Sequence, residues 1–207
     1  MAKRSKTSSQ WLQEHESDPY VKAARAAGLR SRAAFKLEEI HRADRILRPG
    51  MTVIDLGAAP GGWSQIAARI LQGKGRILAS DILEMEPIAG VEMHVGDFTD
   101  EAVLEELMTR LGADRPQLVM SDMAPNTTGI AEVDHSRSMY LAELALDFAH
   151  KTLQPGGDFL VKVFQGREFQ ALTQRLRNSF ASVKARKPKA SRSRSVELYL
   201  LARDFRM

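Results

Sequence analysis

From residue 51 onward, short hydrophobic runs alternate with longer segments in which hydrophobic residues recur at helical spacing. The short runs predict strands at residues 51–57, 76–82, 91–98, 117–124, 157–165, 181–187 and 196–205. The periodic segments predict helices at about 63–72, 100–111, 134–153 and 167–179. This alternation predicts an α/β protein with a Rossmann-like order, a seven-stranded mostly parallel sheet with helices on both faces. No helix separates the last two strands, so we expect a hairpin that adds one antiparallel strand.

A basic helical arm is expected ahead of this pattern, within residues 8–48. Its segment SRAAFKLEEIHRAD, residues 31–44, begins with a serine that is a candidate helix cap and ends before Arg-Pro-Gly. With 207 residues we expect one domain, an arm at 1–48 followed by a core at 49–207. No apolar run approaches the roughly 20 residues of a membrane span, and no export segment follows the basic N-terminus. We therefore expect a cytoplasmic protein.

Charge is distributed unevenly along the chain, although the net charge is only +4. Residues 1–50 carry a net charge of +5 and residues 184–207 carry +6, whereas the part between them carries −7. Basic ends favour contact with a polyanion, while the acidic middle favours a different ligand. The segment KARKPKASRSRS, residues 184–195, is equally compatible with a solvated loop.

The segment VIDLGAAPGGWSQ, residues 53–65, connects the first strand to the first core helix through small residues. Glycine lets a backbone approach a ligand closely, and open parallel sheets bind ligands beyond the carboxyl ends of their strands. One aspartate at such a position is usually a cap or a turn former. Four successive strands end in one here, which indicates a ligand site: Asp55, Asp81, Asp97 and Asp122.

The loop favours S-adenosylmethionine as the ligand over a nicotinamide dinucleotide. A dinucleotide would instead indicate an oxidoreductase. The dinucleotide fingerprint is G-x-G-x-x-G, whereas this loop reads G-A-A-P-G-G-W. Carboxylates repel a pyrophosphate but attract a sulfonium or an ammonium group. We expect Asp81 to hold the ribose hydroxyls and Asp97 to lie near the adenine edge. Trp63 is either a packing anchor or a wall of the cofactor pocket.

Charged residues interrupt three segments that are otherwise apolar. Lys162 lies in FLVKVFQ, residues 159–165, in a strand expected to be buried on both faces, where an unpaired ammonium group is costly. Its stem either reaches solvent or its ammonium group pairs with the acidic cluster, Asp122 foremost. Glu197 interrupts another apolar strand, and Lys36 falls on a helix face that should be buried. Together these residues are candidates to position and deprotonate a ribose hydroxyl for attack on a sulfonium methyl.

The absence of cysteine narrows the possible methylation chemistry. A chain without thiolates cannot form the cysteine adduct used for methylation at carbon 5 of a pyrimidine. It cannot hold an iron–sulfur cluster for radical methylation either. Methylation of exocyclic amines usually goes with Asp/Asn-Pro-Pro-aromatic after the fourth strand, but this chain reads DMAPN at residues 122–126. Methylation of oxygen remains, and we expect no metal site.

Several segments together resemble the FtsJ/RrmJ family of ribose 2′-O-methyltransferases. They are LRSRAAFKLEEI (29–40), VIDLGAAPGGWSQ (53–65), SDMAPN (121–126), LVKVFQG (160–166) and SRSRSVELYLLA (191–202). The likeness runs from about Trp11 nearly to the C-terminus. It implies a Rossmann-like S-adenosylmethionine-dependent methyltransferase fold. It further implies methylation of a uridine ribose in the A loop of large-subunit (23S) rRNA, on the assembled 50S subunit.

The resemblance also implies roles for individual residues. The family's catalytic tetrad corresponds to Lys36, Asp122, Lys162 and Glu197, with Lys162 as the catalytic residue. Its cofactor contacts correspond to Gly61, Trp63, Asp81, Asp97 and Asp122. Basic residues near both ends are candidates for an RNA path through phosphate contacts: Arg30, Arg32, Lys184, Arg186, Lys187, Arg192 and Arg194. We expect a monomer.

Two alternatives remain at this point. The same chemistry is possible on tRNA or on a messenger cap, although a cap enzyme would need aromatic residues to stack a charged guanine, and the chain has 13 aromatic residues with no evident pair in a loop. The chain is also compatible with a ribosome assembly factor whose catalytic role is secondary.

Overall fold

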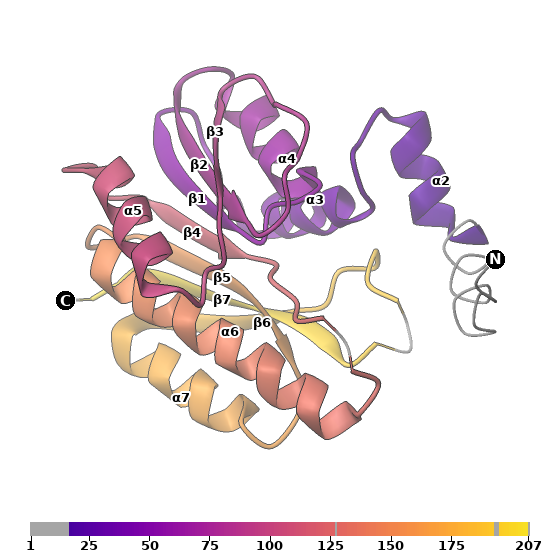
Figure 1. Cartoon of the computed structure of the whole chain (residues 1–207), viewed down its shortest axis with the longest axis vertical. Helices are drawn as coiled ribbons and strands as arrows, with labels where there is room; N and C mark the ends of the chain where they lie inside the picture. Colours follow the sequence, from indigo (N-terminus) through magenta and orange to yellow (C-terminus); the bar gives the residue numbers. More distant parts are fainter. Residues whose placement is uncertain (1–16, 127, 193–194, 207) are drawn as a thin grey trace.

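A central seven-stranded sheet organises the computed structural model, which describes residues 17–126, 128–192 and 195–206 (Figure 1). The strand order is β3-β2-β1-β4-β5-β7-β6, and only β7 runs antiparallel to its neighbours among these strands. The mostly parallel sheet with one reversed strand is therefore confirmed. The strands are β1 (Met51–Leu56), β2 (Gly75–Asp81), β3 (Val91–Val95), β4 (Leu118–Ser121), β5 (Asp158–Phe164), β6 (Phe180–Arg186) and β7 (Glu197–Phe205).

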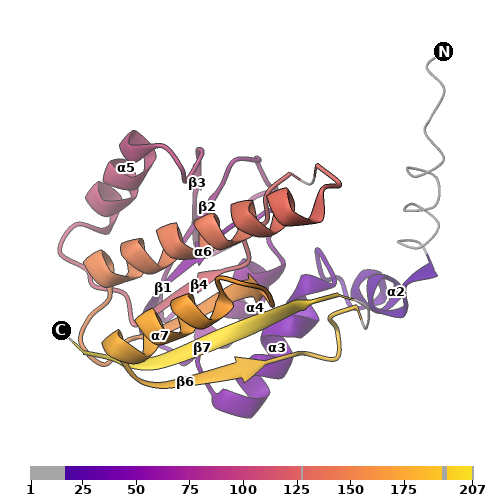
Figure 2. The same cartoon turned by 90° about the horizontal axis from the view of Figure 1, so that it is seen from below.

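Helices cover both faces of the sheet (Figures 1 and 2). One face carries α3 and α4, with α2 packed on α3, and the other face carries α5, α6 and α7. Among the described residues, no helix is both long and apolar enough to span a bilayer. The helices are α2 (Pro19–Ala26), α3 (Ala33–Asp44), α4 (Gly62–Leu71), α5 (Glu101–Leu111), α6 (Ala131–Thr152) and α7 (Phe169–Ser179).

The predicted elements are all present, and the differences lie at their ends. Helix α6 begins at Ala131, three residues before its predicted start, and β3 ends at Val95, three residues early, where the chain turns through Gly96. The prediction that Ser31 caps a helix is wrong, because α3 begins at Ala33 after Arg32, which makes no capping hydrogen bond with its side chain. The Ser31 hydroxyl is instead buried against Gly62.

Side chains alternate between two hydrophobic clusters, one on each face of the sheet. Along β5, Val161 and Val163 pack toward α6 and α7, whereas Leu160 packs toward α3 and α4. Lys162 therefore lies on the face covered by α3. In β7 the same alternation places Tyr199 on that face, directly opposite Lys162 in the antiparallel register.

Candidate active site

The Lys162 ammonium group is paired inside the protein. Its Nζ donates a hydrogen bond of 2.6 Å to the backbone oxygen of Asp122 and lies 3.2 Å from Asp122 Oδ1. Only 9% of Lys162 is exposed. Asp122 is held in turn because its backbone N–H donates to the oxygen of Leu56 at the end of β1. The turn after β4 and strand β5 thus hold the Lys162–Asp122 ion pair in a fixed position.

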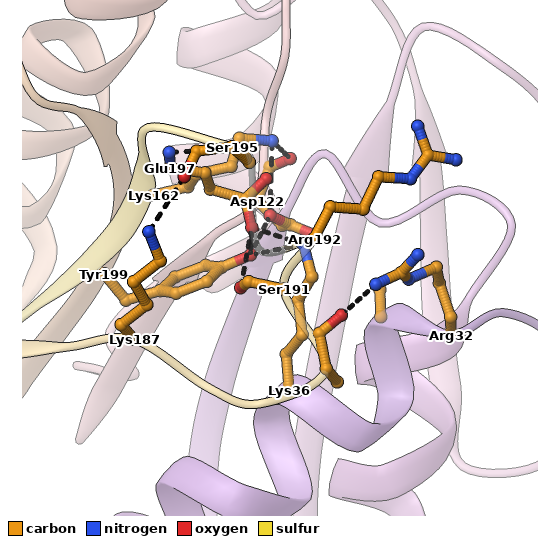
Figure 3. Close-up of polar contacts among 12 residues, drawn as sticks. Arg32, Lys36, Asp122, Lys162, Lys187, Ser191, Arg192, Ser195, Glu197 and Tyr199 are labelled. Atoms are coloured by element: carbon orange, nitrogen blue, oxygen red, sulfur yellow. Dashed lines mark hydrogen bonds and ion pairs between the residues drawn. The ribbon is translucent and has the colours of Figure 1, made fainter. Parts of the chain in front are cut away.

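A second buried ion pair lies beside the first (Figure 3). Lys36 Nζ, from α3, lies 2.6 Å from Glu197 Oε1 at the start of β7. The Ser191 hydroxyl donates to the same carboxylate at 3.2 Å. The structure therefore brings together the four residues that the sequence singled out as candidates, from α3, β5, β7 and the turn after β4.

Tyr199 joins the two pairs through its hydroxyl group. The oxygen accepts a hydrogen bond from Lys36 Nζ at 3.0 Å and lies 2.9 Å from Asp122 Oδ1 and 3.2 Å from Glu197 Oε1. A hydroxyl has one proton, so it donates to one carboxylate at a time. Burial, followed by the charges of Asp122 and Glu197, raises the pKa of Tyr199 well above its usual value, which keeps this residue a neutral hydrogen-bond donor.

Sequence reasoning missed Tyr199, although two signals point to it. It lies two residues after Glu197, so both side chains fall on one face of β7. A tyrosine inside an apolar strand also needs a partner for its hydroxyl group. We name Lys36, Asp122, Lys162, Glu197 and Tyr199 the polar cluster.

Mutual pairing makes these buried charges tolerable. Two ammonium groups face two carboxylates, and their side chains are between 7% and 16% exposed. Removing one partner of such a pair typically costs about 3–5 kcal/mol, because the other charge stays buried without compensation. The arrangement therefore acts as one unit.

Asp122 also faces a cavity of about 600 Å³ at the carboxyl edge of the sheet. The cavity extends past the ends of β1, β2 and β3, and Asp81, Asp97 and Asp122 all line it. Asp81 accepts hydrogen bonds from the N–H groups of Ala59 and Leu83, both at 2.9 Å. Both oxygens of Asp81 are therefore oriented by the backbone, with lone pairs left for a ligand.

Asp97 is held at the third strand end by Thr99. Its Oδ1 accepts from the Thr99 N–H at 2.9 Å and from the Thr99 hydroxyl at 2.7 Å. The backbone hydrogen bond, then that of the hydroxyl, lowers the pKa of Asp97. This carboxylate thus presents a stable negative charge to the cavity.

Gly57 allows β1 to end next to the turn after β4. Its φ is +76°, and a Cβ on it would lie 2.7 Å from the backbone of Met123. Any other residue would push Asp122 and Met123 away from β1.

Gly61 and Trp63, which the resemblance implied as cofactor contacts, are not among the described residues that line this cavity. Side chains of Arg30, Met85 and Ile88 cover Gly61. The Trp63 ring packs 5.5 Å from that of Tyr199, and its Nε1–H donates to the oxygen of Ala33 at 2.9 Å. This placement matches a packing anchor between α3 and α4.

Asp55 is the fourth aspartate of the sequence pattern, and it lies beneath the cavity rather than on its lining. It is fully buried, and its Oδ2 accepts a 2.6 Å hydrogen bond from the Ser64 hydroxyl. Its other oxygen has no partner among the described residues. Burial raises the pKa of Asp55 to about 7, and the charges of Asp122 and Asp81 add to this effect.

Comparison with known proteins identifies the family to which this site belongs. The model of the FtsJ-like methyltransferase family matches residues 29–205. The chain belongs to this family. It is therefore a methyltransferase, and the resemblance inferred from its motifs is confirmed. Membership implies a methyl donor of the S-adenosylmethionine type.

Two curated relatives of this FtsJ-like methyltransferase are similar over nearly their whole length. The ribosomal RNA large subunit methyltransferase E of Pseudomonas fluorescens is 56% identical over 203 residues, which are 98% of this chain and 97% of that protein. The protein of the same name from Pseudomonas paraeruginosa is also 56% identical over 203 residues, 98% of each chain.

Solved structures share the fold. A structure described as a ribosomal RNA methyltransferase from Plasmodium falciparum superposes with a TM-score of 0.76 at 28% identity, covering 85% of this chain and 98% of that one. Human methyltransferase-like protein 13, in complex with SAH, gives 0.58 at 14% identity, covering 83% and 79%. The second likeness concerns the fold alone.

The cavity of this FtsJ-like methyltransferase suits S-adenosylmethionine in its chemistry. Its carboxylates are acceptors for ribose hydroxyls and attract a cationic sulfonium. Three of its lining residues are apolar but largely exposed, which suits the flat face of a base: Ile82, Leu83 and Tyr140. The residues present therefore fit the methyl donor that the family implies.

The basic residues expected to form an RNA path separate into two groups. Arg30 donates to the backbone oxygens of Pro60 and Pro87, Arg32 pairs with Asp18, and Lys187 donates to the oxygen of Ser195. Arg32, Lys187 and Arg192 lie beside the polar cluster (Figure 3), whereas Arg30 lies against Gly61 in the loop before α4. The other group lies farther along β6, where Arg186 pairs with Asp44 and Lys184 lines a different cavity. Arg194 lies outside the described residues.

Proposed function

We propose that this protein transfers a methyl group from S-adenosylmethionine to the ribose 2′-hydroxyl of a uridine in 23S rRNA, on the assembled 50S subunit. One observation carries the proposal: Asp122 belongs both to the cavity lining and to the polar cluster. A methyl donor in the cavity would therefore lie next to buried groups that can orient a hydroxyl and accept its proton. The names of the two Pseudomonas relatives support large-subunit rRNA as the substrate.

The cofactor is held by the carboxyl edge of the sheet in this proposal. Asp81 accepts hydrogen bonds from the ribose hydroxyls, Asp97 lies near the adenine edge, and Asp122 lies near the sulfonium. Gly61 and Trp63 act indirectly, by shaping the loop before α4. S-adenosylmethionine, when bound, supplies an electrophilic methyl group on a positively charged sulfur.

The polar cluster orients and deprotonates the substrate hydroxyl. The ribose oxygen forms a bond to the methyl carbon while the bond from carbon to sulfur breaks, and the hydroxyl proton passes to the Asp122 carboxylate, which also lines the cavity. Lys162 holds that carboxylate and stabilises the negative charge that develops on the ribose oxygen, because its ammonium group is paired with Asp122. Lys36, Glu197 and Tyr199 position the pair, since the Tyr199 hydroxyl is a donor that stays protonated.

The RNA approaches along basic side chains in this proposal. Arg30, Arg32, Lys187 and Arg192 supply phosphate contacts beside the cluster. One chain supplies the cavity and the cluster, which supports action as a monomer.

Methyl transfer from labelled S-adenosylmethionine tests the proposal. The protein is incubated with free 23S rRNA, with 50S subunits and with 30S subunits, and label is counted in the purified RNA. We expect incorporation of about one methyl group per 50S subunit, less into free 23S rRNA and none into 30S subunits. Equal labelling of 30S subunits, or labelling of tRNA alone, would contradict the proposed substrate.

A further inference from the structure

A second cavity, of about 380 Å³, lies at the opposite, amino-terminal edge of the parallel strands. The first residues of β1 and β5, Met51 and Asp158, line it, together with residues of β6 and β7. Asp158 and Lys162 are four residues apart on β5, which corresponds to roughly 13 Å. The second cavity is therefore separate from the site described above.

Basic side chains from three separate segments converge on this cavity. Arg45 and Arg48 come from the connection between α3 and β1, Lys184 comes from β6, and Arg203 comes from β7. The lining also contains two carboxylates. Arg203 neutralises the charge of one carboxylate, because its Nε donates a hydrogen bond of 3.0 Å to Asp158 Oδ2.

The remaining three cations have no partner of opposite charge at hydrogen-bonding distance within the described chain. The side chains of Arg45, Arg48 and Lys184 are exposed and make no hydrogen bond or ion pair there. Arg186, at the carboxyl end of β6, is by contrast paired with Asp44 through two hydrogen bonds, of 2.6 and 2.7 Å. Longer-range attraction links Arg48 to Asp158 and Lys184 to Asp44. Four cations and two carboxylates line the cavity, so it carries an excess of positive charge.

Backbone conformation also marks this cavity. Three described residues other than glycine have positive φ, and two of them line it: Arg45 with φ +52° and Asp204 with φ +63°. For Arg45 this is the left-handed conformation common where a helix ends, because Arg45 caps the C-terminus of α3. The end of α3 therefore fixes where Arg45 meets the cavity.

We propose that this second cavity binds backbone phosphates of an RNA segment other than the one that enters the active site. Arg45, Arg48 and Lys184 supply the charge, and the side chains of Gln117, Gln154 and Ser182 line the same cavity as polar groups. The inference rests on the proposed function, because it assumes an RNA substrate. It assigns Lys184 to this second contact rather than to the path beside the polar cluster.

An extended polyanion fits this geometry better than a small anion does. The cations are exposed and come from separate segments, as expected for a surface that follows a phosphate backbone. A structured rRNA brings several segments close together, so it can contact both edges of the sheet at once. Two contacts on one particle raise the affinity through effective concentration.

Filter binding of a 23S rRNA transcript at several salt concentrations tests the second contact. We expect Arg48→Gln with Lys184→Gln to raise Kd roughly 10-fold near 0.1 M salt, and to reduce the slope of log K against log salt by between about 1 and 2. The matched control is Arg69→Gln with Arg177→Gln, since both residues are exposed and make no ion pair among the described residues. The control should change Kd less than threefold. An equal effect of both double variants would overturn the inference.

Two further measurements separate the possible outcomes. Inorganic phosphate, titrated to 10 mM against wild-type protein by NMR, should shift the signals of cavity residues only weakly. Tight phosphate binding together with unchanged RNA affinity of the double variant would identify a free-anion site and overturn the inference. Methylation at saturating RNA should be unchanged in the double variant. If the wild-type protein does not methylate the RNA, the proposed function is refuted. If the wild type methylates the RNA and the double variant binds RNA with wild-type affinity, only the second contact is refuted.

Discussion

The two edges of the sheet place charge in opposite ways. At the carboxyl edge, two lysines and two carboxylates are buried and contact one another through the Tyr199 hydroxyl. At the amino edge, the side chains of Arg45, Arg48 and Lys184 are exposed and make no hydrogen bond or ion pair among the described residues. Charges of the first kind are fixed in position, whereas those of the second are free to meet a ligand.

This difference teaches how one fold can separate chemistry from binding. Fixed, mutually paired groups can hold a reacting atom in a precise orientation, and this orientation contributes to the catalytic rate enhancement. Exposed cations contribute affinity that depends on salt but not on such geometry. Substitutions at the two edges should therefore change different measured quantities.

The largest effect is expected at the carboxyl edge. Lys162→Ala or Asp122→Ala should lower kcat by ~10² to 10⁴, because positioning and proton transfer are lost together. Single-turnover methyl transfer measures this change. Circular dichroism must show the native fold, and Kd for RNA should stay within threefold. A variant that retains the wild-type rate would remove its residue from the catalytic machinery.

Asp55 should make stability depend on pH. Its pKa is about 7 in the folded protein and 3.8 when unfolded, so between these values the folded state binds more protons. The free energy of unfolding should therefore fall as pH rises from 4 to 7, by at most roughly 4 kcal/mol. Urea titrations of the wild type and Asp55→Asn measure this fall, which the variant should lack. The exposed control Glu132→Gln should keep it, and an unchanged slope in Asp55→Asn would contradict this assignment.

Lys187 and Arg192 provide an intermediate test near the cluster. Replacing both with glutamine should weaken binding of 23S rRNA roughly 5-fold and reduce the salt slope by about 1, because exposed phosphate contacts are lost. The rate at saturating RNA should remain close to that of the wild type. If the salt slope does not change, this segment is a solvated loop with no part in binding.

Tyr199→Phe should lower kcat much less than the substitutions of Lys162 and Asp122. The substitution keeps the ring that packs against Trp63 but removes the hydroxyl between the two ion pairs. We expect kcat to fall about 3- to 10-fold with little change in KM, and stability to fall by about 1–2 kcal/mol, since buried partners lose a hydrogen bond. Steady-state kinetics and thermal melts measure both quantities. A variant that loses stability but retains full kcat would make Tyr199 purely structural.

Sequence patterns predicted the fold and the candidate cluster because both follow from local rules. Strand alternation and strand ends determine where Asp81, Asp97 and Asp122 lie, and a lysine in an apolar strand must find an acid. Contacts between distant segments do not follow such rules. Three features depend on how α3 and β7 pack against the rest of the sheet. They are the contact of Trp63 with Tyr199, the link that the Tyr199 hydroxyl makes between the two ion pairs, and the position of Lys184 in the lining of the second cavity.

The identity of the methylated nucleoside tests the central claim most directly. RNA from 50S subunits treated with the protein is digested to nucleosides and examined by mass spectrometry. The account predicts one additional 2′-O-methyluridine, absent after treatment with Lys162→Ala. A methyl group on a base, or on a ribose other than that of uridine, would contradict it.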